Sequence, residues 1–231
     1  MNMKSLSAFL DTLVDEGLAA YGFACVEGTT HSRYTHLPFA VSLVFRLSNA
    51  VLDEITTEHP VAPTYSYFQH YRAANAYLDN AALRVAAHIE RMGARALPVA
   101  ASQSVPDLGT PHTGVFQHKT AAVLSGLGWI GKSALFVSPE YGPRVRLATV
   151  LTDQPLPVAA PVQAVPCCGE CMVCVSACPA HAITGESYVS GLPRTALFDA
   201  QACSDHMRSH YMKIGRGAVC GICVACCPLG R

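Results

Sequence analysis

Cysteine is the residue type in this sequence with the most obvious capacity for chemistry. The 231 residues include 11 cysteines, and ten of these lie between Cys167 and Cys227. Four of them follow the spacing CxxCxxCxxxCP, namely Cys168, Cys171, Cys174 and Cys178. In this pattern three closely spaced thiolates hold one 4Fe-4S cluster and the fourth thiolate ligates a second cluster. The spacing therefore predicts an iron–sulfur protein.

A second group of cysteines lies nearer the carboxyl end, and its last member precedes a proline as Cys178 does. This group comprises Cys203, Cys220, Cys223 and Cys227. If the groups exchange their last ligands, one cluster is held by Cys168, Cys171, Cys174 and Cys227 and the other by Cys178, Cys203, Cys220 and Cys223. Cys226 is an alternative to Cys227 because it completes a literal CxxCxxC. The remaining cysteines, Cys25, Cys167 and Cys226, are expected to be buried thiols.

Structural zinc is the alternative interpretation of the paired CxxC sequences. Four thiolates of such pairs can bind Zn²⁺ tetrahedrally. A third cysteine three residues further on, followed by a Cys-Pro pair, is unusual for zinc and typical of 4Fe-4S ligation. Two one-electron centres in one small domain would suit the accumulation of electrons for a two-electron reduction.

Composition and charge exclude several classes of protein. Hydrophobic residues make up 51% and charged residues 14%, which indicates a folded chain. Sixteen basic and sixteen acidic residues cancel, so no overall field favours nucleic acid. No apolar stretch reaches the roughly 18 residues that cross a bilayer. Asp11, Asp15 and Glu16 interrupt what would be a secretory signal, so we expect a cytoplasmic protein with no membrane partner.

Helical and strand periodicities mix along the chain without a strand–helix–strand repeat, which indicates an α+β fold. Helices are predicted at residues 6–18, from Pro63–Thr64 to Gly93, and at 118–126. Strands are predicted at 23–28, 39–45 and 94–100, and a hairpin is predicted from 133–138 and 144–152. The proline-rich stretch 154–166 predicts a connector. We therefore expect domains at residues 1–155 and 156–231.

Residues 126–133, GLGWIGKS, satisfy the phosphate-loop pattern GxxxxGK(S/T). That motif requires a preceding strand and a following helix, whose backbone amides cradle the phosphate. Here a predicted helix precedes the motif and a predicted strand follows it. The context argues against nucleotide hydrolysis.

The chain resembles the epoxyqueuosine reductase family of iron–sulfur proteins in three segments, KTAAVLSGLGWIGKSALFVSPEYGPRVRLATVLTDQPL, CGECMVCVSACPAHAI and CGICVACCP. The resemblance runs from about Tyr65 to Pro228. It implies a nitroreductase-like N-terminal domain, related to that of reductive dehalogenases, that holds a corrinoid such as cobalamin. It also implies a C-terminal ferredoxin-like domain with two 4Fe-4S clusters that feeds electrons to the corrinoid. In the family the reaction reduces an epoxide of the modified tRNA base queuosine.

Two departures from the family bear on the expected activity. The family's C-terminal helical-repeat region, associated with tRNA binding, is not part of this sequence, so we expect a small substrate rather than tRNA. The family also has an aspartate, its proposed proton donor, fourteen residues before the first glycine of GLGWIGK, and His112 stands at that position. Imidazole can deliver a proton near neutral pH, so His112 is the candidate acid. A structural histidine is the alternative.

Further candidates for cofactor binding lie on the long helix and around the glycine-rich stretch. They are Arg72, Asn75, His118, Lys119, Gly126, Gly128, Gly131, Lys132 and Ser133. The glycines permit close backbone approach to a cofactor, and the polar side chains offer hydrogen-bond donors. A solvated helix face is the alternative for Arg72 and Asn75, and a structural role is the alternative for His118.

The expected function is that of a reductase. A ferredoxin- or flavodoxin-type donor would reduce the clusters, and a corrinoid in the N-terminal domain would reduce a small substrate. One alternative is an electron-transfer partner that reduces the corrinoid of another protein. Another is a reductase that binds FMN in the N-terminal domain.

Overall fold

The computed structural model describes residues 3–57, 61–105, 111–158, 168–215 and 218–230. The chain forms two compact units, each built from separate segments. The first comprises Met1–Arg46, Ala74–Gly128 and Arg146–Ala164, and the second Leu47–Ala73, Trp129–Val145 and Val165–Arg231. Two stretches that precede residue 155, Leu47–Ala73 and Trp129–Val145, thus belong to the second unit. The domain boundary expected after residue 155 stays a prediction.

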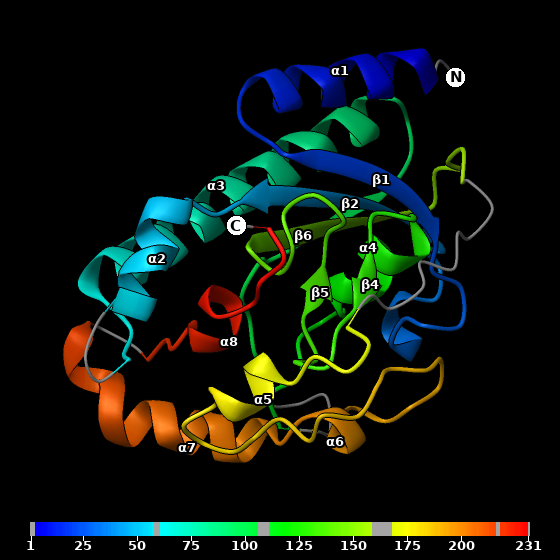
Figure 1. Cartoon of the computed structure of the whole chain (residues 1–231). Helices are drawn as coiled ribbons and strands as arrows, with labels where there is room; N and C mark the ends of the chain where they lie inside the picture. The colour runs from blue at the N-terminus through cyan, green and yellow to red at the C-terminus, as the bar shows by residue number, and fades with distance from the viewer. Residues whose placement is uncertain (1–2, 58–60, 106–110, 159–167, 216–217, 231) are drawn as a thin grey trace. The chain divides into compact units, whose positions relative to one another are not determined.

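A four-stranded sheet forms the centre of the first unit (Figure 1). Its strands are β1 (Ala20–Cys25), β2 (Phe39–Arg46), β6 (Val145–Thr152) and β3 (Ala96–Val99), in that order. Strands β1 and β2 are antiparallel, with Ala20 opposite Val44. Strands β3 and β6 are also antiparallel, with Ala96 opposite Thr152. The two central strands are buried along nearly their whole length, as their continuous apolar sequences predict.

Helices cover both faces of this sheet. On one face lie α1 (Met3–Asp15) and the part of α3 (Tyr65–Arg91) that belongs to this unit, where Leu10, Leu78 and Leu43 share one apolar core. On the other face α4 (His118–Leu124) packs against β1 and β2, and Ala121 shares a second core with Ala24 and Ala40. A single-turn 3-10 helix spans Ser32–Tyr34. The helices and strands predicted for this unit outside the hairpin are therefore present, with the first helix and the first strand each beginning three residues earlier than predicted.

The predicted hairpin between residues 133–138 and 144–152 is wrong. Strand β5 (Phe136–Val137) pairs with β4 (Trp129–Ile130), whereas β6 lies inside the larger sheet. A tight turn does form between them, with Ser138 and Gly142 exchanging backbone hydrogen bonds of 2.8 and 2.9 Å. The pairing stops there because β6 is apolar on both faces and gains more from the centre of a covered sheet.

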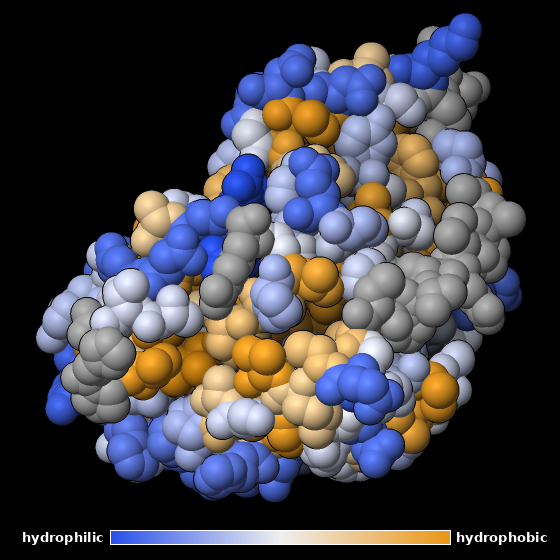
Figure 2. Space-filling view, in the orientation of Figure 1, coloured by the Kyte–Doolittle hydropathy of each residue, from blue (hydrophilic) through white to orange (hydrophobic). Residues whose placement is uncertain are grey.

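The second unit consists mostly of short helices. They are α2 (Asn49–Thr57), α5 (Val173–Ser176), α6 (Arg194–Leu197), α7 (Ala200–Tyr211), α8 (Ile222–Ala225) and a 3-10 turn at Met212–Ile214. Apolar surface is exposed over α5 and α8 (Figure 2), and the side chains of Met172 and Val173 contribute to it. None of the helices in the described ranges is both long and apolar enough to span a membrane.

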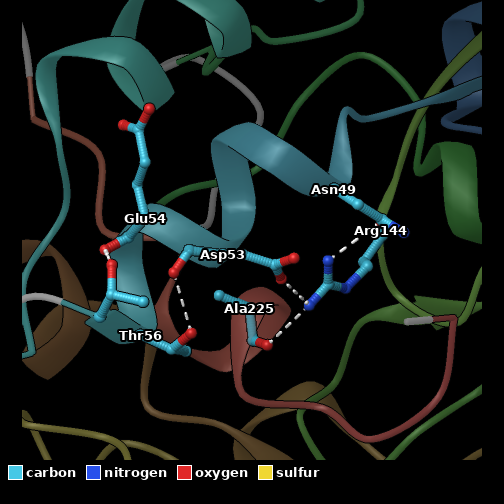
Figure 3. Close-up of polar contacts among 7 residues, drawn as sticks. Asn49, Asp53, Glu54, Thr56, Arg144 and Ala225 are labelled. Carbon is cyan, nitrogen blue, oxygen red and sulfur yellow. Dashed lines mark hydrogen bonds and ion pairs between the residues drawn. The ribbon is translucent and has the colours of Figure 1, made fainter.

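The fully buried side chain of Arg144 ties two of these helices together (Figure 3). Its Nη1 donates to Asn49 Oδ1 at 3.0 Å, and its Nη2 donates to Asp53 Oδ1 at 2.9 Å, both on α2. Nη2 also donates to the carbonyl oxygen of Ala225 at 3.1 Å, at the end of α8. A buried guanidinium is tolerated when its donors find such acceptors. Arg144 therefore fixes the end of α8, from which the last cysteines follow.

We predict that Gly142→Ala destabilises the second unit by about 2 kcal/mol or more. Gly142 has a φ of +55°, and an added Cβ would collide with the backbone carbonyl of Leu229. Gly28→Ala is the matched control, because Gly28 has a φ of +75° but nothing within 4 Å of an added Cβ. Anaerobic urea unfolding followed by circular dichroism measures both losses. Equal losses of unfolding free energy in the two variants would contradict the close approach of the Leu229 backbone to Gly142.

Candidate metal centre

Two one-turn helices position the cysteines at corresponding places. Cys174 is the second residue of α5, and Cys223 is the second residue of α8. In each case a Cys-Pro pair follows four residues later, at Cys178 and Cys227. The two helices contact each other within the second unit. This arrangement gives the pair of motifs an approximate internal symmetry, as their sequences suggest.

One cavity of about 90 Å³ in the second unit is lined by Cys223 and by four other cysteines, which we call the first cysteine set. They are Cys168, Cys171, Cys174 and Cys227. Burial raises the pKa of the Cys174 thiol, and the neighbouring thiolates of this set raise it further. Burial also raises the pKa of Cys227, against which the amide of Leu229 and the charge of Arg144 act. The four thiols are thus close enough to repel one another when they ionise.

The other four cysteines form a second cysteine set, comprising Cys178, Cys203, Cys220 and Cys223. Burial raises the pKa of Cys220 to about 11, and the charges of Cys203 and Cys178 add to this effect. Burial also raises the pKa of Cys223 well above its ordinary value. Burial, Cys178 and Asp199 together raise the pKa of Cys203. The electrostatic interactions among these thiols agree with the expected exchange of last ligands, and the ligand assignment stays a prediction.

Cys226 and Cys227 differ in their surroundings. Cys227 interacts electrostatically with Cys168 and Cys171 of the first cysteine set, whereas Cys226 acts on Cys223 of the second. Cys25 was expected to be a buried thiol, and this is wrong because it is exposed at the end of β1. Cys226 is only partly buried, and Cys167 lies outside the described residues.

The donor chemistry of both sets fits 4Fe-4S clusters. Thiolate is the metal-binding form, and bound iron supplies the positive charge that stabilises thiolates in a buried site. Among the described residues, no three His, Cys, Asp or Glu side chains converge closely enough to hold one metal ion. The backbone at Gly131 approaches the first set closely, since an added Cβ would lie 3.4 Å from Cys168 Sγ and 2.9 Å from Val137 Cγ2.

The glycine-rich stretch is divided between the units. Gly131, Lys132 and Ser133 line the cavity of the first cysteine set. Gly126 is exposed with a φ of +75°, and Gly128 is buried, both in the first unit. Residues 131–134 form a tight turn that leads into β5. The Ala134 amide closes this turn by donating a 2.9 Å hydrogen bond to the Gly131 carbonyl. The helix that a phosphate loop needs is replaced by a strand, as the sequence order predicts.

His118 uses both of its ring nitrogens within the first unit. Its Nδ1 lies 2.9 Å from Thr149 Oγ1, and its Nε2 lies 2.9 Å from the carbonyl oxygen of Ala100. Burial lowers the pKa of His118 to about 4, with Arg146 lowering it further and the Ala100 contact opposing the shift. The imidazole is therefore neutral at pH 7, with Nε2 donating to Ala100, and neither nitrogen faces a ligand in this arrangement.

The remaining candidates are dispersed. Asn75 is buried in the first unit, where its Oδ1 accepts a 2.9 Å bond from Arg146 Nε. Arg72 belongs to the second unit and is exposed, with its guanidinium 5.6 Å from the centroid of the Phe68 ring. Lys119 is half-buried on α4. His112 is half-buried in the left-handed backbone region at a φ of +59°, which is uncommon for a residue with a Cβ.

Sequence reasoning missed two arginines that organise these surroundings. Arg144 fixes α8 as described above, and Arg146 joins Asn75 to the carbonyl oxygen of Ala101, to which its Nη2 donates at 3.1 Å. A signal was present, because RVRLATVLT places both charges in or beside an otherwise apolar strand. Charges in such a strand indicate buried partners.

Comparison with known families defines the class of the cysteine-rich segment. Residues 167–230 match the model of the 4Fe-4S double cluster binding domain. The chain therefore carries a 4Fe-4S cluster binding domain, which agrees with the cysteine spacing and disfavours the zinc interpretation.

Sequence comparison then gives the relationship of the chain. Epoxyqueuosine reductase of Listeria monocytogenes is 31% identical over 121 residues, which cover 52% of this chain and 31% of the relative. Tetrachloroethene reductive dehalogenase of Sulfurospirillum multivorans is 34% identical over 130 residues, which cover 51% and 24%. The chain is thus a homologue of the epoxyqueuosine reductases, as its motifs predict. It spans about a third of the length of the curated epoxyqueuosine reductases it matches.

Solved structures show that the fold is shared. A reductive dehalogenase whose structure suggests a mechanism for B12-dependent dehalogenation has a TM-score of 0.71 at 20% identity, covering 99% of this chain and 31% of that chain. Epoxyqueuosine reductase with an epoxyqueuosine-modified tRNA stem loop has a TM-score of 0.57 at 17% identity, covering 97% and 66%. The mixed helix and sheet fold is therefore confirmed, and its description as nitroreductase-like stays a prediction.

We predict that the stability conferred by His118 depends on pH. Because the folded pKa of about 4 lies below the ordinary value of 6.5, folding favours the neutral ring. Its contribution is complete above pH 6.5 and is lost as the pH falls towards 4, by about 2–3 kcal/mol. His118→Gln can keep the contacts with Ala100 and Thr149 and does not titrate. The free energy of unfolding of both proteins is measured by urea unfolding at pH 7 and at pH 4.5. Between these pH values the wild type should lose about 2–3 kcal/mol more than His118→Gln does. An unchanged difference would contradict the account.

Proposed function

We propose that this chain is an iron–sulfur oxidoreductase in which each cysteine set holds one 4Fe-4S cluster. On this proposal the two-cluster domain supplies electrons to a corrinoid in the first unit, where a small substrate is reduced. The observation that carries the proposal is the gathering of eight thiols into two sets within a segment that matches a 4Fe-4S double cluster binding domain. The reductases and dehalogenases among its relatives support the reaction type.

The residues of the second unit would bind and insulate the clusters. The thiolates of each set bind iron, and burial around Cys223 and Cys178 keeps water away from the second set. The turn at Gly131 lets the backbone lie against Cys168, and Arg144 holds the end of α8 so that Cys227 completes the first set. Clusters of this kind carry single electrons when bound.

The corrinoid and the acid are the parts of the proposal that concern the first unit. Corrinoid binding is supported by the description of a structural relative as B12-dependent. His112 is the proposed proton donor, and its left-handed backbone is the sort of strain that clusters at functional sites. Lys119, Gly126 and Gly128 are proposed to border the corrinoid. An external ferredoxin- or flavodoxin-type protein is the proposed electron donor.

A small substrate is proposed because the chain has no net charge to attract a polyanion. The epoxyqueuosine reductase crystallised with a tRNA stem loop makes tRNA the competing substrate. Mobility shift with an unmodified tRNA at physiological salt separates these possibilities. Binding at micromolar concentration would contradict the small-substrate proposal.

We predict that Cys227→Ser lowers the iron content of anaerobically purified protein from about eight to about four atoms per chain. The variant removes one ligand of the first cysteine set and leaves the second set intact. Cys226→Ser is the matched control and should keep about eight irons. Colorimetric iron and acid-labile sulfide assays measure both variants. Loss of iron in Cys226→Ser alone would instead assign Cys226 as the ligand, and stoichiometric zinc in the wild type would contradict the whole proposal.

A separate prediction concerns the corrinoid. Anaerobic incubation of the purified protein with cobalamin should shift the absorption bands to those of a base-off species. A flavin spectrum released on unfolding in air would favour the FMN-binding alternative. Unchanged cobalamin bands without flavin would favour the electron-transfer partner that reduces a corrinoid elsewhere.

A further inference from the structure

Lys132 presents a buried positive charge to the first cysteine set. Its side chain lines the cavity that holds all four cysteines of the first set and, from the second set, Cys223, and the residue is only 8% exposed. Among the described residues, its Nζ contacts the neutral sulfur of Met172 at 3.6 Å and no carboxylate. Burying an ammonium without an opposite charge costs free energy, so an anionic neighbour is needed to stabilise it. A cluster with four thiolate ligands would be such an anion.

The charges around the two sets differ. Arg144 also acts on the first set through Cys227, but its guanidinium is paired with Asp53 at 2.9 Å, which offsets its effect. The ammonium of Lys132 has no such offset among the described residues. Near the second set, the carboxylate of Asp199 lies close enough to Cys203 to act on its thiol. Of these three groups, the ammonium without an ion-pair partner lies at the first set and the carboxylate lies at the second.

We propose that Lys132 is a redox-tuning residue that raises the reduction potential of the cluster in the first cysteine set above that of the cluster in the second. The inference rests on the proposed function, since it requires both clusters. Reduction adds one electron and one negative charge to a cluster, and no bond forms or breaks. A nearby ammonium stabilises the reduced form more than the oxidised form. Electrons supplied by an external donor therefore collect at the first set.

The test is a redox titration of the full-length protein with both clusters, using dithionite as the reductant and electron paramagnetic resonance as the readout. The signal of the first set is the one lost in Cys227→Ser. In Lys132→Met, the ratio of reduced to oxidised first cluster at a fixed potential should fall about tenfold, which corresponds to about 59 mV for a one-electron couple. The second cluster should be unchanged. Lys132→Arg should retain most of the wild-type potential.

Lys213→Met is the matched control, because Lys213 is an exposed lysine of the same unit. It should leave both potentials at their wild-type values. If Lys132→Met fails to hold the first cluster, Lys132→Gln is titrated in its place, and loss of the cluster in both neutral variants would overturn the tuning role. Two intact clusters with wild-type potentials in Lys132→Met would overturn this inference and leave the proposed function standing. A wild-type chain without iron would overturn both.

Discussion

The electrostatics of crowded, buried thiols is the constraint on which the rest of this structure depends. Both sets contain cysteines whose pKa values are raised by burial and by the charges of neighbouring thiolates, Cys174 and Cys227 in the first and Cys203, Cys220 and Cys223 in the second. Such thiols cannot ionise together without a compensating positive charge. Iron would provide that charge, and the second unit brings the cysteines together from segments far apart in the sequence. The short helices α5 and α8 supply equivalent cysteines, and Arg144 anchors the second of these helices to α2.

The same reasoning separates the roles of three buried basic groups. Arg144 donates through Nη1 and Nη2 to Asn49, Asp53 and Ala225, and acts mainly as a structural link between helices. Lys132 lies at the cavity with a neutral sulfur as its contact among the described residues, and is therefore suited to influence a cluster. His118 is neutral at pH 7 and joins α4 to the sheet through Thr149. Burial alone would not distinguish these groups, whereas their partners do.

Much of the fold could be predicted from local sequence patterns. Apolar residues three and four apart predicted α1 and α3, and a continuous apolar run predicted β2 as a buried strand. The cysteine spacing predicted a 4Fe-4S cluster binding domain, since ligand geometry is encoded over a few residues, and the division of the ligands into two sets stays a prediction. The partner of β6 could not be predicted, because the choice depends on which sheet buries both of its faces. The contacts of Arg144 were equally hidden, as Asp53 lies 91 residues away and carries no distinguishing signal.

Native mass spectrometry of anaerobically purified protein tests the central claim most directly. The account predicts a chain whose mass exceeds that of the polypeptide by two 4Fe-4S units and falls by one unit on mild oxidation of a single cluster. A mass equal to the bare polypeptide, to the polypeptide with disulfide bonds, or to the polypeptide with zinc would contradict it.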